Sequence, residues 1–129
     1  MLVHVSIRTS NLKRSIDFYT KLLGLKIVNR IEIPQNKAEL VFLRDSKAEG
    51  ATLELTFIGD QKKFVQADYE DRLFDHLAFE VQDMTKILKA MRETGVTITD
   101  EPYRLNPKGN LLAFVEDPDG TLIELIENA

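Results

Sequence analysis

The order of apolar and polar residues divides the chain into short strands and amphipathic helices. Residues 2–8, LVHVSIR, alternate between an apolar and a mixed face, which predicts a β-strand. Residues 9–24 predict a helix that Ser10 or Asn11 caps and Gly24 closes. Its apolar stripe is Leu12, Ile16, Tyr19 and Leu23. The runs LKIVNRIEI, AELVFLRD and ATLELTFIG predict three more strands, the first two joined around Pro34, Gln35 and Asn36.

The same pattern starts again after residues 61–73, which are polar, lack a period and are interpreted as a connection. DHLAFEV predicts a strand with Asp75 on the face opposite His76. Asp83 is the expected cap of a helix that ends at Gly95. The stripe of this helix is Met84, Ile87, Leu88 and Met91. VTITDEP, NLLAFVED and TLIELIEN predict three strands, with a tight turn at DPDG, residues 117–120.

The chain is therefore a repeat of the order βαβββ. His4 precedes Gly24 by 20 residues and His76 precedes Gly95 by 19, so the two halves keep nearly the same spacing. We expect an α+β fold with a first βαβββ module at residues 1–60, the connection at 61–73 and a second module at 74–129. One helix covers only one face of a four-stranded sheet, so the other face must pack on something or help to enclose a cavity.

Composition removes several classes of function. The chain has 129 residues, a net charge of −4 and no cysteine, and its basic residues form no stripe. Nucleic acid is therefore not an expected partner, and a disulfide framework is excluded. No apolar run approaches the roughly 18 residues of a membrane span, and the first residues lack a signal-peptide pattern. We expect a cytoplasmic protein.

One histidine and one glutamate recur at equivalent places in the two modules. His4 and Glu54 are 50 residues apart, His76 and Glu124 are 48 apart, and these are the only histidines in the chain. A single histidine in a strand is usually an ordinary core or surface residue, but the repeated pairing favours a metal site. Imidazole nitrogens and carboxylate oxygens suit Ni²⁺, Co²⁺, Zn²⁺, Fe²⁺ or Mn²⁺. Four protein ligands leave about two positions of an octahedron open, as catalysis requires.

These residues, with SIDFYTKLLGLK and LAFVEDPDGTLIELIE, resemble the vicinal oxygen chelate superfamily and, within it, bacterial-type glyoxalase I. The resemblance covers nearly the whole chain. It implies modules that pair as open eight-stranded barrels, usually across a homodimer. Each site would then combine His4 and Glu54 of one copy with His76 and Glu124 of the other. The implied cofactor is one divalent ion per site, with Ni²⁺ or Co²⁺ favoured and Zn²⁺ as the third candidate.

The resemblance also implies a reaction and roles for side chains. Glyoxalase I isomerises the hemithioacetal of methylglyoxal and glutathione to S-lactoylglutathione through an enediolate. Glu124 would be the main base, with Glu54 as a ligand and as a proton acceptor for the other epimer. The residues expected to bind the carboxylates of glutathione are Arg8, Arg72 and Lys108. Ile58 stands where the family often has an asparagine that binds glutathione, so the identity of the thiol stays open.

Two other functions fit parts of the pattern. The first is another isomerase or epimerase of the superfamily, such as one resembling methylmalonyl-CoA epimerase, although those enzymes tend to have glutamine at the position of Glu54. The second is a non-catalytic small-molecule binding or resistance protein, although such members generally lose the metal ligands. Extradiol dioxygenases fit less well, because they gather their ligands within one module and have longer chains.

Overall fold

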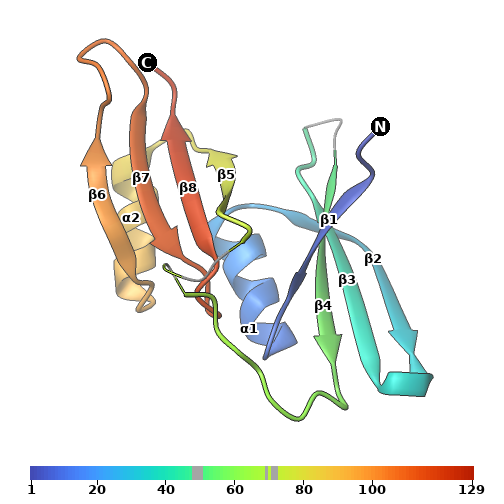
Figure 1. The fold of residues 1–129 in the computed structure, drawn as a ribbon. Coiled ribbons are helices and arrows are strands. Elements are labelled where there is room, and N and C mark those ends of the chain that lie inside the picture. Colours follow the sequence, from blue (N-terminus) through green and yellow to red (C-terminus); the bar gives the residue numbers. More distant parts are fainter. Residues whose placement is uncertain (48–50, 69, 71–72) are drawn as a thin grey trace. The chain divides into compact units, whose positions relative to one another are not determined.

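The computed structural model describes residues 1–47, 51–68, 70 and 73–129, and it divides the chain into two compact units, residues 1–65 and 66–129. Each unit is an open four-stranded sheet with one helical segment (Figure 1). The α+β fold of two βαβββ units expected from the sequence is confirmed. The exact limits of the two modules and the connection stay a prediction. No helix in the described ranges is long and apolar enough to cross a membrane.

The first unit has the strand order β1-β4-β3-β2, with β1 parallel to β4 and the other pairs antiparallel. Its elements are β1 (His4–Arg8), α1 (Leu12–Asp17), the π-helical turn η1 (Phe18–Leu22), β2 (Lys26–Ile33), the 3₁₀ turn η2 (Pro34–Asn36), β3 (Ala38–Arg44) and β4 (Thr52–Ile58). The helix α1 contacts β4. The fully buried side chains of β3 and β4 are Val41, Leu43 and Leu55. These residues occupy the alternate positions that share one face, so the face that carries Glu54 is the opposite one.

The second unit repeats this topology as β5-β8-β7-β6, again with its first and last strands parallel. Its elements are β5 (His76–Glu80), α2 (Met84–Glu93), β6 (Ile98–Tyr103), β7 (Leu111–Glu116) and β8 (Leu122–Glu127). The helix α2 contacts β8. The fully buried side chains of β7 and β8 are Ala113, Val115, Ile123 and Leu125. Glu124 alternates with Ile123 and Leu125 and therefore belongs to the other face of the sheet.

The helix ends follow the expected capping chemistry. Asn11 accepts a hydrogen bond from the backbone of Arg14, and Asp83 accepts one from Lys86. Gly24 and Gly95 take left-handed backbone angles, with φ of 77° and 79°. These are the conformations that end a helix and that glycine adopts without steric cost.

The first helix departs from the expected stripe at its end. Leu12 and Tyr19 are buried as predicted, but Phe18 and Ser15 are also buried, whereas Ile16 and Leu23 are only partly so. After Asp17 the chain continues as a π-helical turn, which shifts the spacing of the side chains there, so that Phe18 is buried next to Tyr19. In α2, Met84, Leu88 and Met91 are buried as expected, whereas Ile87 is only partly buried.

A short turn at residues 117–120 joins β7 to β8. The side chain of Asp117 accepts hydrogen bonds from the backbone N–H groups of Asp119 and Thr121, both at 2.9 Å. Gly120 has a φ of 85°, and a Cβ built on it would lie 2.9 Å from the carbonyl oxygen of Ala67. The DPDG sequence therefore forms the tight turn that was predicted and sets the register of Glu124 against β7.

Candidate metal and catalytic site

The first unit brings His4 and Glu54 together on one face of its sheet. In the ladder between β1 and β4, His4 pairs with Thr52 and Ser6 pairs with Glu54, so the two side chains lie diagonally across neighbouring strands. Nε2 of His4 is 3.6 Å from Oε2 of Glu54. Phe42 of β3, the other partner of Glu54, meets the imidazole edge-on, with the ring centroids 5.9 Å apart. Glu54 therefore lies on a strand with two neighbours, a parallel one that carries His4 and an antiparallel one that carries Phe42.

The second unit builds the same arrangement from different residues. His76 pairs with Leu122, and Ala78 pairs with Glu124, so this histidine and glutamate have the same diagonal relationship. Nε2 of His76 is 3.1 Å from Oε2 of Glu124. Phe114 of β7 pairs with Glu124 and meets the imidazole edge-on at a centroid distance of 5.5 Å. The repeat seen in the sequence is thus a repeat of geometry down to the aromatic neighbour.

Burial makes the two carboxylates costly unless they have partners. The exposed fraction of the side chain is 10% for Glu54 and 17% for Glu124, against 45% for His4 and 32% for His76. A charged carboxylate removed from water must be paired, hydrogen-bonded or bound to a cation. Among the described residues, Glu54 forms an ion pair with His4 and Glu124 forms one with His76. Imidazole nitrogen and carboxylate oxygen are both ligands of the transition metals in the expected set.

Each unit contains one histidine–glutamate pair. Among the described residues, no three or more His, Cys, Asp or Glu side chains gather closely enough to hold a metal ion. Each unit by itself supplies two of the four ligands that the sequence analysis expected. The four side chains are brought together in pairs by the structure, and their joint role as ligands remains a prediction.

Comparison with known proteins identifies the family. The model of the Glyoxalase/Bleomycin resistance protein/Dioxygenase superfamily matches residues 1–125. The chain belongs to this superfamily. Its similarity to relatives of known activity indicates the branch of the superfamily.

Three relatives show this similarity. The chain is 36% identical to the lactoylglutathione lyase of Escherichia coli O157:H7 over 127 residues, which cover 98% of this chain and 91% of that protein. It is 34% identical to the trypanothione-dependent glyoxalase I of Leishmania major, with a TM-score of 0.77 and coverage of 98% and 86%. For glyoxalase I from Zea mays the values are 29% identity, a TM-score of 0.80, and coverage of 99% and 44%. The expected resemblance to glyoxalase I is confirmed, and this superfamily member is glyoxalase-I-like.

The structure places the residues that were expected to bind an anionic substrate in different surroundings. Arg8 ends β1 on the same face as His4, and its guanidinium donates a hydrogen bond to the side chain of Gln61. Lys108 lies in the loop between β6 and β7, exposed to solvent. Arg72 lies outside the described residues. Ile58, the last residue of β4, is partly exposed and presents an apolar side chain. For Arg8 and Lys108 a binding role stays a prediction.

Sequence reasoning missed one contact at this site. The carboxylate of Asp75 reaches Nδ1 of His76, with an Oδ2–Nδ1 distance of 2.6 Å. Simple alternation placed these two residues on opposite faces, which is wrong because β5 begins only at His76. Asp75 is outside the ladder, so the alternation of side chains along a strand does not fix the direction of its side chain. The signal available in the sequence was a carboxylate directly before a candidate ligand.

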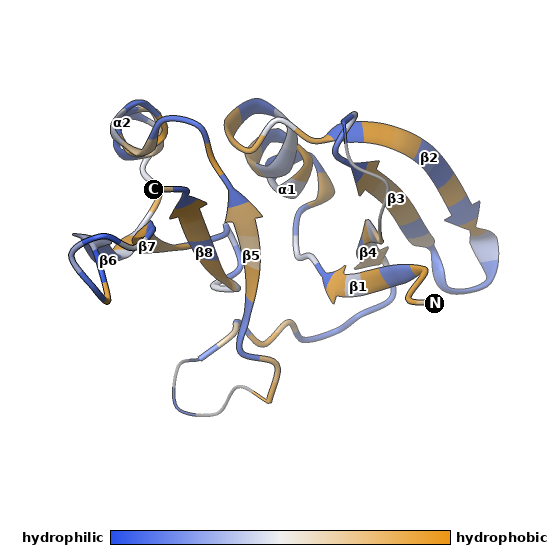
Figure 2. Cartoon of the chain, turned by 90° about the horizontal axis from the view of Figure 1, so that it is seen from above, coloured by the Kyte–Doolittle hydropathy of each residue, from blue (hydrophilic) through white to orange (hydrophobic). Residues whose placement is uncertain are grey.

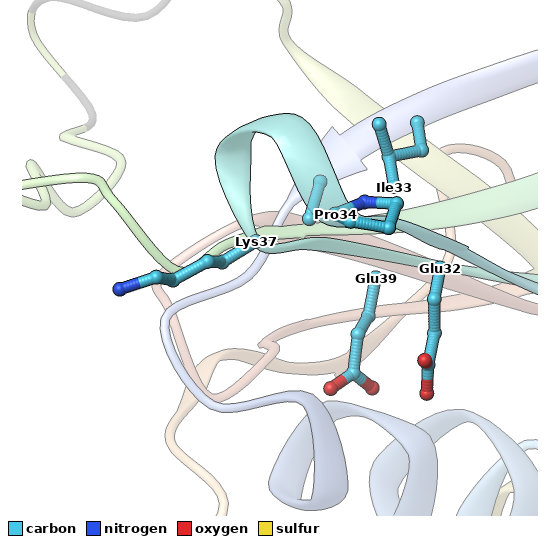
Figure 3. Close-up of a pocket in the computed structure, with 6 residues that line it drawn as sticks. Glu32, Ile33, Pro34, Lys37 and Glu39 are labelled. Atoms are coloured by element: carbon cyan, nitrogen blue, oxygen red, sulfur yellow. The ribbon is translucent and has the colours of Figure 1, made fainter.

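A separate pocket lies at the hairpin between β2 and β3 (Figure 3). It has a volume of about 220 Å³ and is lined by Glu32, Ile33, Pro34, Lys37, Ala38 and Glu39. Two of its charged groups have protein partners, since Lys37 pairs with Asp60 and Glu39 pairs with Arg30. Glu39 alternates with Phe42 along β3 and lies on the face opposite Glu54. The pocket is therefore separate from the candidate site, and we assign no function to it.

Proposed function

We propose that this protein is a metal-dependent lyase of the glyoxalase I type. Its substrate would be the hemithioacetal of methylglyoxal and a thiol, and its product the 2-hydroxyacyl thioester, S-lactoylglutathione when the thiol is glutathione. The observation that carries the proposal is the duplicated pair: a histidine and a glutamate in the same register of two equivalent sheets, each with the same aromatic neighbour. Chance packing gives no reason for this duplication, whereas a shared ion does.

The donor atoms fit the expected cofactor. His4, Glu54, His76 and Glu124 would hold one divalent ion, with Ni²⁺ or Co²⁺ favoured and Zn²⁺ as the third candidate, because the set offers nitrogen and oxygen and no sulfur. We propose that a homodimer assembles each site, with two of these ligands from each copy. When bound, the ion supplies Lewis acidity to the substrate oxygens.

The chain's own task in this reaction is to move a proton. A hemithioacetal becomes a 2-hydroxyacyl thioester when the proton on one carbon is transferred to its neighbour through an enediolate. We assign Glu124 as the base that removes and returns this proton, because its side chain is the more accessible of the two glutamates. Leu122 and Phe114 add apolar side chains to the neighbouring positions of the ladders, as the partners of His76 and Glu124. Glu54 is assigned as a ligand and as the acceptor for the other epimer.

The thiol is set by groups around the site. Arg8 is proposed to bind a carboxylate of the thiol, and Lys108 and Arg72 to contribute further positive charge. Ile58 offers no hydrogen bond to an amide or carboxylate. Either glutathione binds without that contact or another thiol replaces it. The cytoplasm remains the proposed compartment.

The decisive experiment is a thioester assay. Purified protein is loaded with Ni²⁺, Co²⁺ or Zn²⁺ and mixed with methylglyoxal and glutathione, or with a second low-molecular-weight thiol. We expect thioester absorbance to rise with at least one metal and to vanish with a chelator. Absence of thioester with every metal and thiol would contradict the proposal. Racemisation of methylmalonyl-CoA by the same samples would then favour the epimerase alternative.

A further inference from the structure

The two ring nitrogens of His76 face two different carboxylates. Nδ1 lies 2.6 Å from Oδ2 of Asp75, whereas Nε2 lies 3.1 Å from Oε2 of Glu124. A neutral imidazole has one N–H and one nitrogen lone pair, and an ionised carboxylate can only accept a hydrogen bond. The shorter contact is therefore the one at which the N–H is best placed, and this leaves the lone pair on Nε2.

We infer that Asp75 is a positioning residue that fixes the tautomer and the orientation of His76. This inference rests on the proposed function, because Nε2 is the atom proposed to bind the metal. A histidine ligand generally donates its other N–H to a carboxylate or carbonyl, which holds the ring in place and makes the ligand nitrogen more basic. Asp75 supplies that second partner, and the edge of Phe114 limits rotation of the ring from the side.

The equivalent histidine of the first unit lacks this device. The residue before His4 is Val3, which has no carboxylate. Among the described residues, the one carboxylate that contacts His4 is that of Glu54, whose Oε2 lies 3.6 Å from Nε2. His4 is also the more exposed imidazole, at 45% against 32%. The structure thus assigns the better prepared half of the metal site to the second unit.

The experiment compares Asp75→Ala and Asp75→Asn with the unsubstituted chain. Metal-free full-length protein is titrated with Co²⁺ by calorimetry, and the tautomer of each imidazole is read from its ¹⁵N chemical shifts with both rings neutral. Asp75→Ala is expected to weaken Co²⁺ binding by about 10- to 100-fold, the usual cost of losing such a partner. It is also expected to move the proton of His76 from Nδ1 toward Nε2. Asp75→Asn should recover most of both effects, because its amide oxygen still accepts the hydrogen bond.

A matched control removes the same charge from β5, the strand that follows Asp75. Glu80→Ala lies at the far end of β5 and leaves the contact between Asp75 and His76 intact, so Co²⁺ binding should be unchanged. The side chain of Asp75 is 74% exposed, and its loss leaves the core of the unit intact.

The results separate this inference from the proposal beneath it. If the unsubstituted chain binds Co²⁺ and Asp75→Ala binds it equally well with the same tautomer, the inference is overturned and the metal site stands. An equal loss in Asp75→Ala and Asp75→Asn, with no change of tautomer, also overturns it, since charge alone would then be responsible. If the unsubstituted chain binds no Co²⁺, Ni²⁺ or Zn²⁺, the proposed function fails and the inference fails with it.

Discussion

Phe114 meets the imidazole of His76 at an angle of 89° between the ring planes, with the centroids 5.5 Å apart. Phe42 and His4 repeat this edge-on contact at 77° and 5.9 Å. Each aromatic ring is the cross-strand partner of the glutamate beside the histidine, so one register sets all three side chains. Equivalent registers in the two sheets therefore build the same histidine–glutamate–phenylalanine arrangement twice, which leads to the following tests.

Loss of either histidine should remove the metal. His4→Ala and His76→Ala each delete one of the four proposed ligands, and an ion held by ligands from both kinds of unit depends on both. Elemental analysis of the purified variants should show about one divalent ion per site in the unsubstituted protein and a large loss in each variant. Asp60→Ala, an exposed carboxylate variant of the first unit, is the control and should keep its metal. A variant with one histidine removed and full metal content would argue against a shared site.

The two glutamates should differ in catalysis. Glu124→Gln keeps the size of the side chain but removes the proposed base, so kcat should fall by about 100-fold or more. Glu54→Gln keeps an oxygen ligand and should lower kcat less. The rate of thioester formation at saturating substrate, measured at equal metal content, checks this order. The reverse order would move the role of base to Glu54.

The position of Ile58 should influence the choice of thiol. Ile58→Asn introduces an amide at the end of β4, where the side chain is only partly buried and the amide can be solvated. One added neutral hydrogen bond is worth about 1 kcal/mol, or roughly a fivefold lower KM for the glutathione hemithioacetal. Ile58→Val is the matched apolar control. If both variants leave the ratio of KM values for different thiols unchanged, Ile58 does not face the thiol.

Gly120 and Gly95 form a matched pair for a test of stability. Both have positive φ, 85° and 79°, so alanine at either position pays a backbone penalty of about 1–2 kcal/mol. A Cβ on Gly95 would meet nothing within 4 Å, whereas one on Gly120 would lie 2.9 Å from the carbonyl oxygen of Ala67. Gly120→Ala should therefore lower the free energy of unfolding more than Gly95→Ala in chemical denaturation. Equal decreases in the free energy of unfolding would show that the backbone at Ala67 moves aside without an energetic penalty.

Protonation of Asp17 should contribute to the loss of folding stability at acid pH. The hydrogen bond from Lys13 lowers the pKa of Asp17 below its ordinary value of 3.8; partial desolvation opposes this, and Lys21 adds to the lowering. A lowered pKa in the folded state means that the ionised form stabilises the fold above the unfolded pKa, and that this contribution disappears as pH falls through the folded pKa. Asp17→Asn should be less stable than the unsubstituted chain at neutral pH and equal to it in strong acid. High salt should shrink the difference at neutral pH, because the pairs are exposed. A difference that persists in acid would point to packing instead.

The hydropathy pattern was enough to predict the elements of both units. Strands with alternating faces, capped helices and the turn at residues 117–120 are local features, because each depends on side chains a few positions apart (Figure 2 shows the alternation along β2). The repeat then placed His4 with Glu54 and His76 with Glu124, since equivalent positions in equivalent modules have equivalent neighbours. Sequence alone was also sufficient for the resemblance to glyoxalase I.

Tertiary structure decided which residues surround the two pairs. Phe42 and Phe114 contact the imidazoles because of the register between neighbouring strands, and register is a property of the whole sheet. Asp75 reaches His76 because pairing with β8 begins at His76, and alternation along one strand does not reveal where pairing begins. Local spacing thus determined the candidate ligands, and long-range pairing determined the groups that orient them.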